Sequence, residues 1–279
     1  MKIFLAGCAI VMVAACVPVP PLTSRGQVAA PQTERGNIGA TPAPQPRAAA
    51  APSTAPRFSQ REISGITFEG VAFDSRVAKL SVVDQAGGPG SEFPDAANAG
   101  QAAGGIVAVN ASFFTPQGTP LGLVVAGGYL RGQWNNASSL GSGVWYQAAS
   151  GKSAIVRREK LGKATAGQMQ ELIQAGPMLV ENARAITGLD ATKTSARIAI
   201  LWNGDSQWWI GRSSPCTLAA FAQALTNGNP AGWRTVSALN LDGGRSADLW
   251  VSAAIPGGPI SRRSPWNRPV RNFLILKKL

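Results

Sequence analysis

Short apolar runs separated by glycine-containing turns recur along residues 58–279, and they constrain the fold more than any other feature. Runs of this length, rich in β-branched residues and bounded by glycine or asparagine, are typical of strands. Gly127-Gly128 and residues 203–206 each separate two such runs, which is typical of hairpin turns. The sequence therefore predicts a domain built mainly from short β-strands.

The apolar runs place strands and helices along the whole domain. We expect short helices at 94–103, 167–173 and 217–226. We expect strands at 63–73, 77–83, 106–109, 123–126, 129–131, 143–147, 153–157, 178–180, 197–202, 207–212, 236–241 and 270–276. The pattern lacks a regular alternation of strand and helix, so it predicts an α+β domain around a large mixed, mostly antiparallel β-sheet with a few short helices.

The first residues predict export. Lys2 precedes an apolar stretch, 3–14, that is too short to span a bilayer. The segment 13–16, small residues before Cys16, resembles the lipobox of bacterial lipoproteins. We therefore expect a signal peptide at 1–15, lipidation of Cys16, and a membrane partnership through the lipid anchor. A secretory signal cleaved nearby and an uncleaved anchor are the alternatives. Val17, where an aspartate would favour the inner membrane, indicates the outer membrane facing the periplasm.

Proline and alanine dominate residues 16–57, which carry almost no large apolar side chains. Such a segment buries too little surface to offset its ordering entropy, so it is expected to be a disordered tether. Residues 58–279 are long enough for one domain with a sizeable core.

Composition excludes several kinds of chemistry. The chain has no histidine, which removes serine–histidine and cysteine–histidine catalysis and the commonest zinc ligand. The net charge of +12 suits anionic partners, namely phosphorylated glycans, lipid head groups or nucleic acid. A phosphorylated glycan fits better than nucleic acid, because the basic residues are scattered and the chain is expected to be exported. The sequence leaves the oligomeric state open.

The most informative local motif is the apolar run 236–241, which ends at Asp242 and leads into Gly243 and Gly244. The glycines permit positive φ and a close approach by a ligand. Asp242 thus stands where a rigid strand gives way to a permissive loop, a common place for chemistry. The alternative is a hairpin turn in which Asp242 hydrogen-bonds its own backbone.

Two other strand ends carry polar groups. Asn110 follows the run 106–109, and its amide suits the fixing of a sugar hydroxyl or a water. Thr194 precedes Arg197, whose guanidinium suits an oxyanion or a phosphate. An Asx turn and a solvated arginine are the respective structural alternatives. The Gly-Pro within 174–179 indicates a fixed turn with a structural role.

These segments, in this order, resemble the phosphodiester glycosidase family. The matching motifs are Asn110-Ala111-Ser112-Phe113-Phe114, Gly176-Pro177-Met178-Leu179, Thr194-Ser195-Ala196-Arg197-Ile198-Ala199, Leu241-Asp242-Gly243-Gly244-Arg245-Ser246 and the closing Arg268-Pro269-Val270. The resemblance spans most of 63–276 and implies hydrolysis of a sugar-1-phosphodiester in an envelope or extracellular glycan. Three residues depart from the family pattern, because Ala111, Ser112 and Arg245 stand where glycines are usual.

One carboxylate suits that reaction. Ordinary glycosidases need two, because an alkoxide leaving group must be protonated, whereas a departing phosphomonoester is already a stable anion. With the resemblance, we expect Asp242 and Asn110 to be catalytic. The expected substrate-binding residues are Arg197 as phosphate clamp, Thr194, Asn240, Gly243, Gly244, Ser246 and Phe113.

A non-catalytic envelope lipoprotein that binds an anionic glycan is the rival hypothesis. Its candidate contact residues are Trp134, Trp208, Trp209 and Trp266. No cofactor and no metal site are predicted. A divalent cation held by Asp242, Asn240 and Asn110 stays open, although their spacing does not demand one.

Overall fold

The computed structural model describes residues 55–279. The predicted signal peptide, Cys16 and nearly all of the predicted tether lie outside the described residues. The first strand, β1, begins at Arg57, one residue before the predicted start of the domain.

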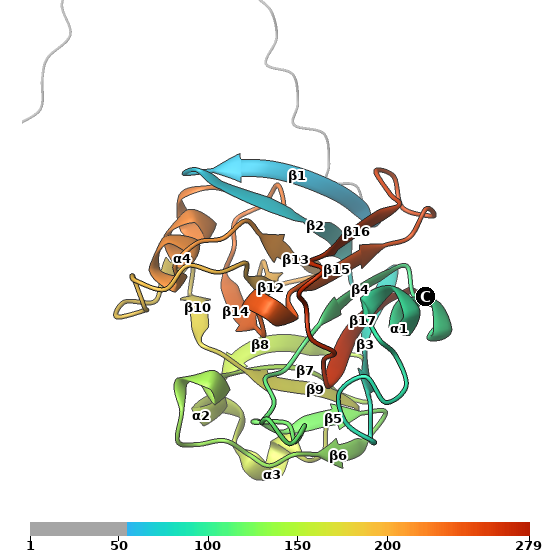
Figure 1. Ribbon diagram of the computed structural model, residues 1–279. Helices are drawn as coiled ribbons and strands as arrows, with labels where there is room; N and C mark the ends of the chain where they lie inside the picture. Colours follow the sequence, from blue (N-terminus) through green and yellow to red (C-terminus); the bar gives the residue numbers. More distant parts are fainter. Residues whose placement is uncertain (1–54) are drawn as a thin grey trace, which may run out of the picture. The chain divides into compact units, whose positions relative to one another are not determined.

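In the described part of the chain, seven antiparallel strands form the first sheet, in the order β1-β2-β13-β12-β14-β10-β11 (Figure 1). Their bounds are β1 Arg57–Ile63, β2 Ile66–Asp74, β10 Met178–Glu181, β11 Arg184–Ala185, β12 Ile198–Trp202, β13 Gln207–Ser213 and β14 Ser237–Leu241. Helix α4, Leu218–Asn227, packs against this sheet through Phe221 and Leu225.

Two five-stranded antiparallel sheets complete the described fold. The second sheet has the order β16-β15-β4-β17-β3, with β3 Ala78–Asp84, β4 Val107–Asn110, β15 Asp248–Val251, β16 Ile260–Arg263 and β17 Asn272–Lys278. The third has the order β6-β5-β9-β7-β8, with β5 Val124–Ala126, β6 Tyr129–Arg131, β7 Gly143–Gln147, β8 Ser153–Arg157 and β9 Glu171–Ala175. The remaining helices are short: α1 Ala96–Ala102, η1 Ser139–Gly141, α2 Arg158–Leu161, α3 Lys163–Ala166 and η2 Gly244–Ser246.

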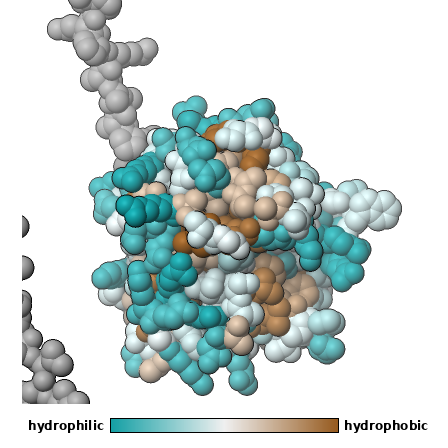
Figure 2. Space-filling model, turned by 90° about the vertical axis from the view of Figure 1, so that its left-hand side faces the viewer, coloured by the Kyte–Doolittle hydropathy of each residue, from teal (hydrophilic) through white to brown (hydrophobic). Residues whose placement is uncertain are grey.

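The main core lies where the three sheets meet. It contains Val71 from the first sheet, Leu80 from the second and Trp145 from the third, all almost fully buried. Burial of such side chains is the main favourable contribution to folding. On the face shown in Figure 2, apolar residues form small groups bordered by hydrophilic ones. No helix within residues 55–279 combines the length and hydrophobicity that crossing a bilayer requires.

The predicted fold class is confirmed, and the strands divide among three sheets around one core rather than forming one large sheet. Two predicted elements are wrong. The expected helix at 167–173 is a turn followed by the start of strand β9, because residues 171–173 are buried and pair with β5 and β7. The expected strand at 63–73 is interrupted by a turn at Ser64 and Gly65, both with positive φ, which separates β1 from β2.

Candidate functional site

A short loop carries the chain from the first sheet to the second. Strand β14 ends at Leu241 and β15 begins at Asp248, so residues 242–247 lie at the junction of the two sheets. A Cβ on Gly243 would lie 2.6 Å from the carbonyl oxygen of Ala196, and Gly244 has a φ of +59°. The amide of Gly244 also donates to that carbonyl, at 2.7 Å. Gly243 is therefore required by the close approach of two chain segments, and Gly244 is favoured by its positive φ.

Asn110 holds this loop from the second sheet. Its side-chain nitrogen donates to the carbonyl of Asp242 at 2.6 Å, and its side-chain oxygen accepts from the amide of Asp248 at 2.9 Å. The amide of Asp242 donates to the carbonyl of Ala111 at 2.8 Å. Asn110 is fully buried, and both halves of its amide bond to loop backbone. The geometry thus gives Asn110 a positioning role, which differs from the expected direct contact with sugar or water.

Asp242 is a partly buried carboxyl with few charge partners. Burial raises its pKa from 3.8 to about 6, and the Ser246 hydroxyl and the Gly243 amide donate hydrogen bonds that limit the rise. A carboxyl with a pKa near neutrality can accept or donate a proton under physiological conditions. Asp242 and Ser246, both predicted site residues, are therefore together.

A pocket of about 420 Å³ opens over this carboxyl. Its lining combines two aromatic rings, one carboxyl and two guanidinium groups, from Phe113, Phe114, Thr115, Pro116, Asp242, Gly243, Arg245, Ser246 and Arg268. The amide of Arg268 donates to the carbonyl of Arg245 at 3.0 Å, which fixes the two segments to each other. An excess of positive charge beside one carboxyl suits an anionic ligand.

Arg197 lies beside the loop but does not line this pocket. Its Nε donates to the carbonyl of Cys216 at 3.0 Å and one terminal nitrogen to the carbonyl of Lys193 at 2.7 Å. Thr194 is exposed and also lies outside the pocket lining. The segment 194–197 therefore contacts the loop 242–247 through the carbonyl of Ala196, and the arginines that line the pocket are Arg245 and Arg268 rather than Arg197.

Asn240 lies in strand β14, two residues before Asp242, and does not line the pocket. Its side-chain nitrogen donates to the carbonyl of Gly176 at 2.8 Å, and its own amide donates to the carbonyl of Pro177 at 3.1 Å. Asn240 Oδ1 is buried and has no hydrogen-bond partner among the described residues. The Gly-Pro turn thus abuts the strand that carries Asp242, as its expected structural role implies.

Two of the departures from the family pattern belong to the same framework. The carbonyl of Ala111 accepts a hydrogen bond from the amide of Asp242. The amide and the hydroxyl of Ser112 form hydrogen bonds with the side chain of Asn272 on β17. The third departure, Arg245, lines the pocket. Ala111 and Ser112 therefore support the loop without entering the pocket.

Sequence reasoning missed several lining residues. Phe114 is adjacent to a predicted residue, and Arg245 was noted only as a departure from a glycine pattern. Arg268 reaches the pocket from the connection between β16 and β17. The closing Arg-Pro-Val motif was the available signal for Arg268.

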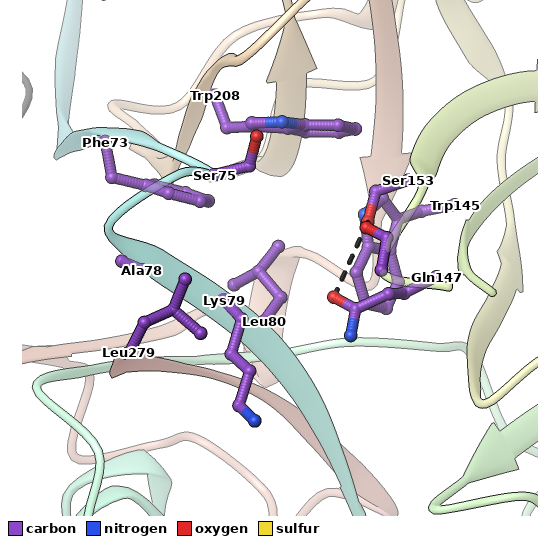
Figure 3. Close-up of a pocket in the computed structure, with 11 residues that line it drawn as sticks. Phe73, Ser75, Ala78, Lys79, Leu80, Trp145, Gln147, Ser153, Trp208 and Leu279 are labelled. Carbon is purple, nitrogen blue, oxygen red and sulfur yellow. Dashed lines mark hydrogen bonds between the residues drawn. The ribbon is translucent and has the colours of Figure 1, made fainter. Parts of the chain in front are cut away.

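A second pocket, of about 120 Å³, is lined by strands of all three sheets (Figure 3). Phe73 and Trp208 lie on one side of this space, with Trp145, Gln147 and Ser153 grouped on another. Among the described residues that line it there is no carboxyl side chain. The ionisable side chain in this lining is that of Lys79, so this smaller pocket offers no carboxyl side chain comparable to Asp242.

The side-chain oxygens of the two asparagines named for a possible cation differ in their partners. That of Asn110 accepts from the amide of Asp248, whereas that of Asn240 has no partner among the described residues. Within residues 55–279, no three His, Cys, Asp or Glu side chains are grouped as metal ligands.

Comparisons with known proteins agree with the motifs. Residues 103–277 match the family model for phosphodiester glycosidase. A search of the curated proteins finds no match to the sequence.

Three solved structures share the fold. The catalytic domain of zebrafish N-acetylglucosamine-1-phosphodiester alpha-N-acetylglucosaminidase, auto-inhibited by its pro-peptide, matches with a TM-score of 0.55 and 16% identity, over 81% of this chain and 83% of that chain. A hypothetical protein from Synechocystis matches with a TM-score of 0.55 and 17% identity, over 78% and 61%. A putative exported protein from Burkholderia pseudomallei matches with a TM-score of 0.51 and 14% identity, over 76% and 74%.

Proposed function

The chain belongs to the phosphodiester glycosidase family, and we propose that it hydrolyses a sugar-1-phosphodiester bond in an envelope or extracellular glycan. The observation that carries this proposal is the meeting of Asp242, Arg245 and Arg268 in one pocket. In this proposal the carboxyl acts at the anomeric carbon of the sugar, and the guanidinium groups bind the phosphate.

The proposed reaction needs one proton acceptor. A water oxygen attacks the anomeric carbon, the bond from that carbon to the phosphate oxygen breaks, and the phosphomonoester departs with the bonding electrons. Asp242 takes a proton from the water and stabilises the positive charge that develops on the sugar. With a pKa of about 6, Asp242 is mostly ionised at pH 7 and can act in this way.

The arginines act on the leaving group. Charge grows on the phosphate as the bond breaks, and guanidinium groups are suited to phosphate oxygens. The presence of Arg268 and Arg245 in the pocket lining supports this role for them, while Arg197 binds the carbonyls of Cys216 and Lys193 and does not line the pocket. Phe113 offers an apolar surface to the sugar, and Ser246 orients the carboxyl of Asp242.

The test is hydrolysis of a panel of sugar-1-phosphodiesters, followed by phosphorus NMR. We expect the wild type to release a phosphomonoester and a free sugar. Asp242→Asn should lose turnover, and Arg268→Gln should lose it in part. Asp205→Asn, an exposed aspartate in the β12–β13 hairpin, is the matched control and should retain full activity. Full turnover by Asp242→Asn would refute the assignment.

The rival function, binding of an anionic glycan without cleavage, is favoured by one observation. Arg245 brings a second guanidinium into the pocket, and a second positive charge also strengthens the binding of an intact anionic glycan. Calorimetry with the same panel separates the two functions. Tight binding of an intact glycan, with no cleavage across the panel, would favour the binding protein.

We also propose that the protein is lipid-anchored through Cys16 at the outer membrane and faces the periplasm. The lipobox-like segment before Cys16 supports this. Cys16→Ala should abolish membrane association and change electrophoretic mobility. Unchanged processing and unchanged membrane association would refute the anchor.

We further propose that hydrolysis needs no metal ion. The engagement of Asn110 by two backbone groups supports this, because its oxygen is already occupied. Activity should survive titration with a chelator. Loss of activity that a divalent cation restores would refute metal independence.

A further inference from the structure

The smaller pocket lies at the end of the first sheet that points away from Asp242, and side chains of the main core form much of its lining. Trp208, in that lining, pairs with Trp202, and Trp202 pairs with Ser237 at the start of β14. Asp242 follows the other end of β14, five positions further along, or roughly 17 Å at the rise of an antiparallel strand. The smaller pocket is therefore separate from the Asp242 pocket, and the proposed hydrolysis does not use it.

Three aromatic side chains line the smaller pocket. Phe73 and Trp208 are each 2% exposed and Trp145 is 1% exposed, so the core holds their rings in place. The volume of about 120 Å³ is close to that of an engineered apolar cavity of about 150 Å³ that binds benzene. Aromatic rings pack well against one another in offset or edge-to-face arrangements. The walls and the volume together favour a single aromatic ring as the occupant.

A buried hydrogen-bond donor without an acceptor belongs to the same lining. Nε1 of Trp145 has no hydrogen-bond partner among the described residues. Gln147 follows on the same face of β7, and Ser153 lies opposite Gln147 on β8, so the three side chains are grouped (Figure 3). The Ser153 hydroxyl donates to Gln147 at 3.5 Å, a long bond that leaves both groups with hydrogen-bonding capacity. A hydroxyl on a ligand can therefore accept from Trp145 and donate to Gln147 or Ser153.

Lys79 brings a positive charge to the side of the pocket opposite Ser153 (Figure 3). It is exposed and forms no ion pair with the residues that the structure describes. Lys277 lies directly across from it on β17. Burial raises the pKa of Glu171 and the charges of the two lysines lower it in part, so two ammonium groups share one buried carboxyl. Lys79 is thus available to an anionic group of a ligand.

We propose that the smaller pocket binds a small aromatic acid, in which one ring carries a carboxylate at one end and a hydroxyl at the other. The ring packs among Phe73, Trp145 and Trp208. The hydroxyl oxygen accepts from Nε1 of Trp145, and the carboxylate pairs with Lys79 at the mouth. This is a second ligand site, and it does not depend on the proposed hydrolysis of a glycan.

Calorimetry on the full chain tests the site with four probes. The first is 4-hydroxybenzoate, which has the ring, the hydroxyl and the charge. Benzoate lacks the hydroxyl, 4-hydroxybenzamide lacks the charge, and hexanoate lacks the ring. We expect 4-hydroxybenzoate to bind and the other three to bind roughly fivefold to tenfold more weakly. Absence of binding by 4-hydroxybenzoate, or equal binding of hexanoate, would overturn the site.

The hydroxyl contact is tested at Trp145. Trp145→Phe keeps an aromatic ring and removes the indole N–H, so it should weaken 4-hydroxybenzoate roughly tenfold and leave benzoate within about twofold. Trp209→Phe is the matched control and should change neither affinity. Trp209 is also buried and its Nε1 also has no partner among the described residues, but it lies outside the lining. Equal weakening of both acids by Trp145→Phe would overturn the proposed orientation of the ligand.

The charge contact is tested at Lys79. Lys79→Met removes the ammonium group and keeps a long side chain, so it should abolish the preference for 4-hydroxybenzoate over 4-hydroxybenzamide. Lys277→Met removes the same charge from the position directly opposite, outside the lining, and should retain the preference. Because Lys79 is exposed, this comparison still decides the matter if Trp145→Phe does not fold. An unchanged preference in Lys79→Met would overturn the carboxylate site.

Discussion

Asp242→Asn should stabilise the protein while it abolishes hydrolysis. The folded protein raises the pKa of this carboxyl from 3.8 to about 6, chiefly through burial. Folding therefore disfavours the ionised carboxylate, at a cost of about 1.4 kcal/mol for each tenfold change in the proton affinity. The full cost at pH 7.5 is about 3 kcal/mol, and asparagine, which does not ionise, avoids it.

Because the pKa of Asp242 is raised in the folded protein, the stability of the wild type depends on pH in a predictable direction. Below pH 3.8 the carboxyl is protonated in both the folded and the unfolded chain, and it imposes no cost of ionisation. As the pH rises from 3.8 to about 6, the unfolded chain loses its proton first, so the stability of the wild type falls relative to that of the variant. Above pH 6 the difference between the two proteins is constant.

Urea denaturation of both proteins at pH 4 and at pH 7.5 measures this difference. At pH 4 the variant should match the wild type or lie slightly below it, because the amide meets the hydrogen-bond donors of Ser246 and Gly243. At pH 7.5 it should gain about 2–3 kcal/mol relative to its value at pH 4. Asp205→Asn, which changes an exposed aspartate, should show no such gain. An equal effect of Asp242→Asn at both pH values would refute a desolvated carboxyl.

Three further substitutions test the framework of the fold. Glu171→Ala leaves the buried backbone N–H of Val82 in β3 without its acceptor and should cost about 1–3 kcal/mol in chemical denaturation. Glu171→Gln keeps an acceptor and should cost less. Equal losses of stability in the two variants would contradict this. Arg271→Ala removes the two bonds that pair both carboxylate oxygens of buried Asp84, leaving it with Arg131 at 3.8 Å, and should cost about 3 kcal/mol in thermal denaturation. Asn110→Ala frees two buried backbone groups and should cost about 2–5 kcal/mol and lower turnover, and unchanged turnover would refute its hold on Asp242.

Local signals predicted the elements that local interactions stabilise. The helix expected at 217–226 is α4, Leu218–Asn227, and the hydroxyl of Thr217 accepts from the amide of Ala220 at 3.1 Å, a local N-cap. The expected helix at 167–173 failed because β9 is defined by partners far along the chain, β5 and β7. Propensity carries no information about such partners, and tertiary pairing overrides it.

In the candidate site, too, local patterns predicted some residues, whereas others depend on long-range packing. Asp242, Gly243 and Gly244 could be identified from the sequence, because an apolar run that ends in an acidic residue and two glycines is a local pattern. The roles of Arg197 and Arg268 depended instead on which segments dock against the loop, and that follows from packing over long distances in the sequence. Asn110 was predicted as a site residue, but the sequence did not indicate its positioning role. That role rests on a hydrogen bond to the carbonyl of Asp242, 132 positions away in the sequence.

Strand β17 lies between β3 and β4, although it comes from the other end of the domain. Strand β3 therefore cannot join the second sheet until residues 272–278 pair with both β3 and β4, and the bonds from Ala111 and Ser112 to Asn272 cannot form before then. Such a high contact order slows folding, because the loop between paired segments must be closed first. A chain cut short before β17 would present two unpaired strand edges, and would aggregate rather than retain a partial pocket.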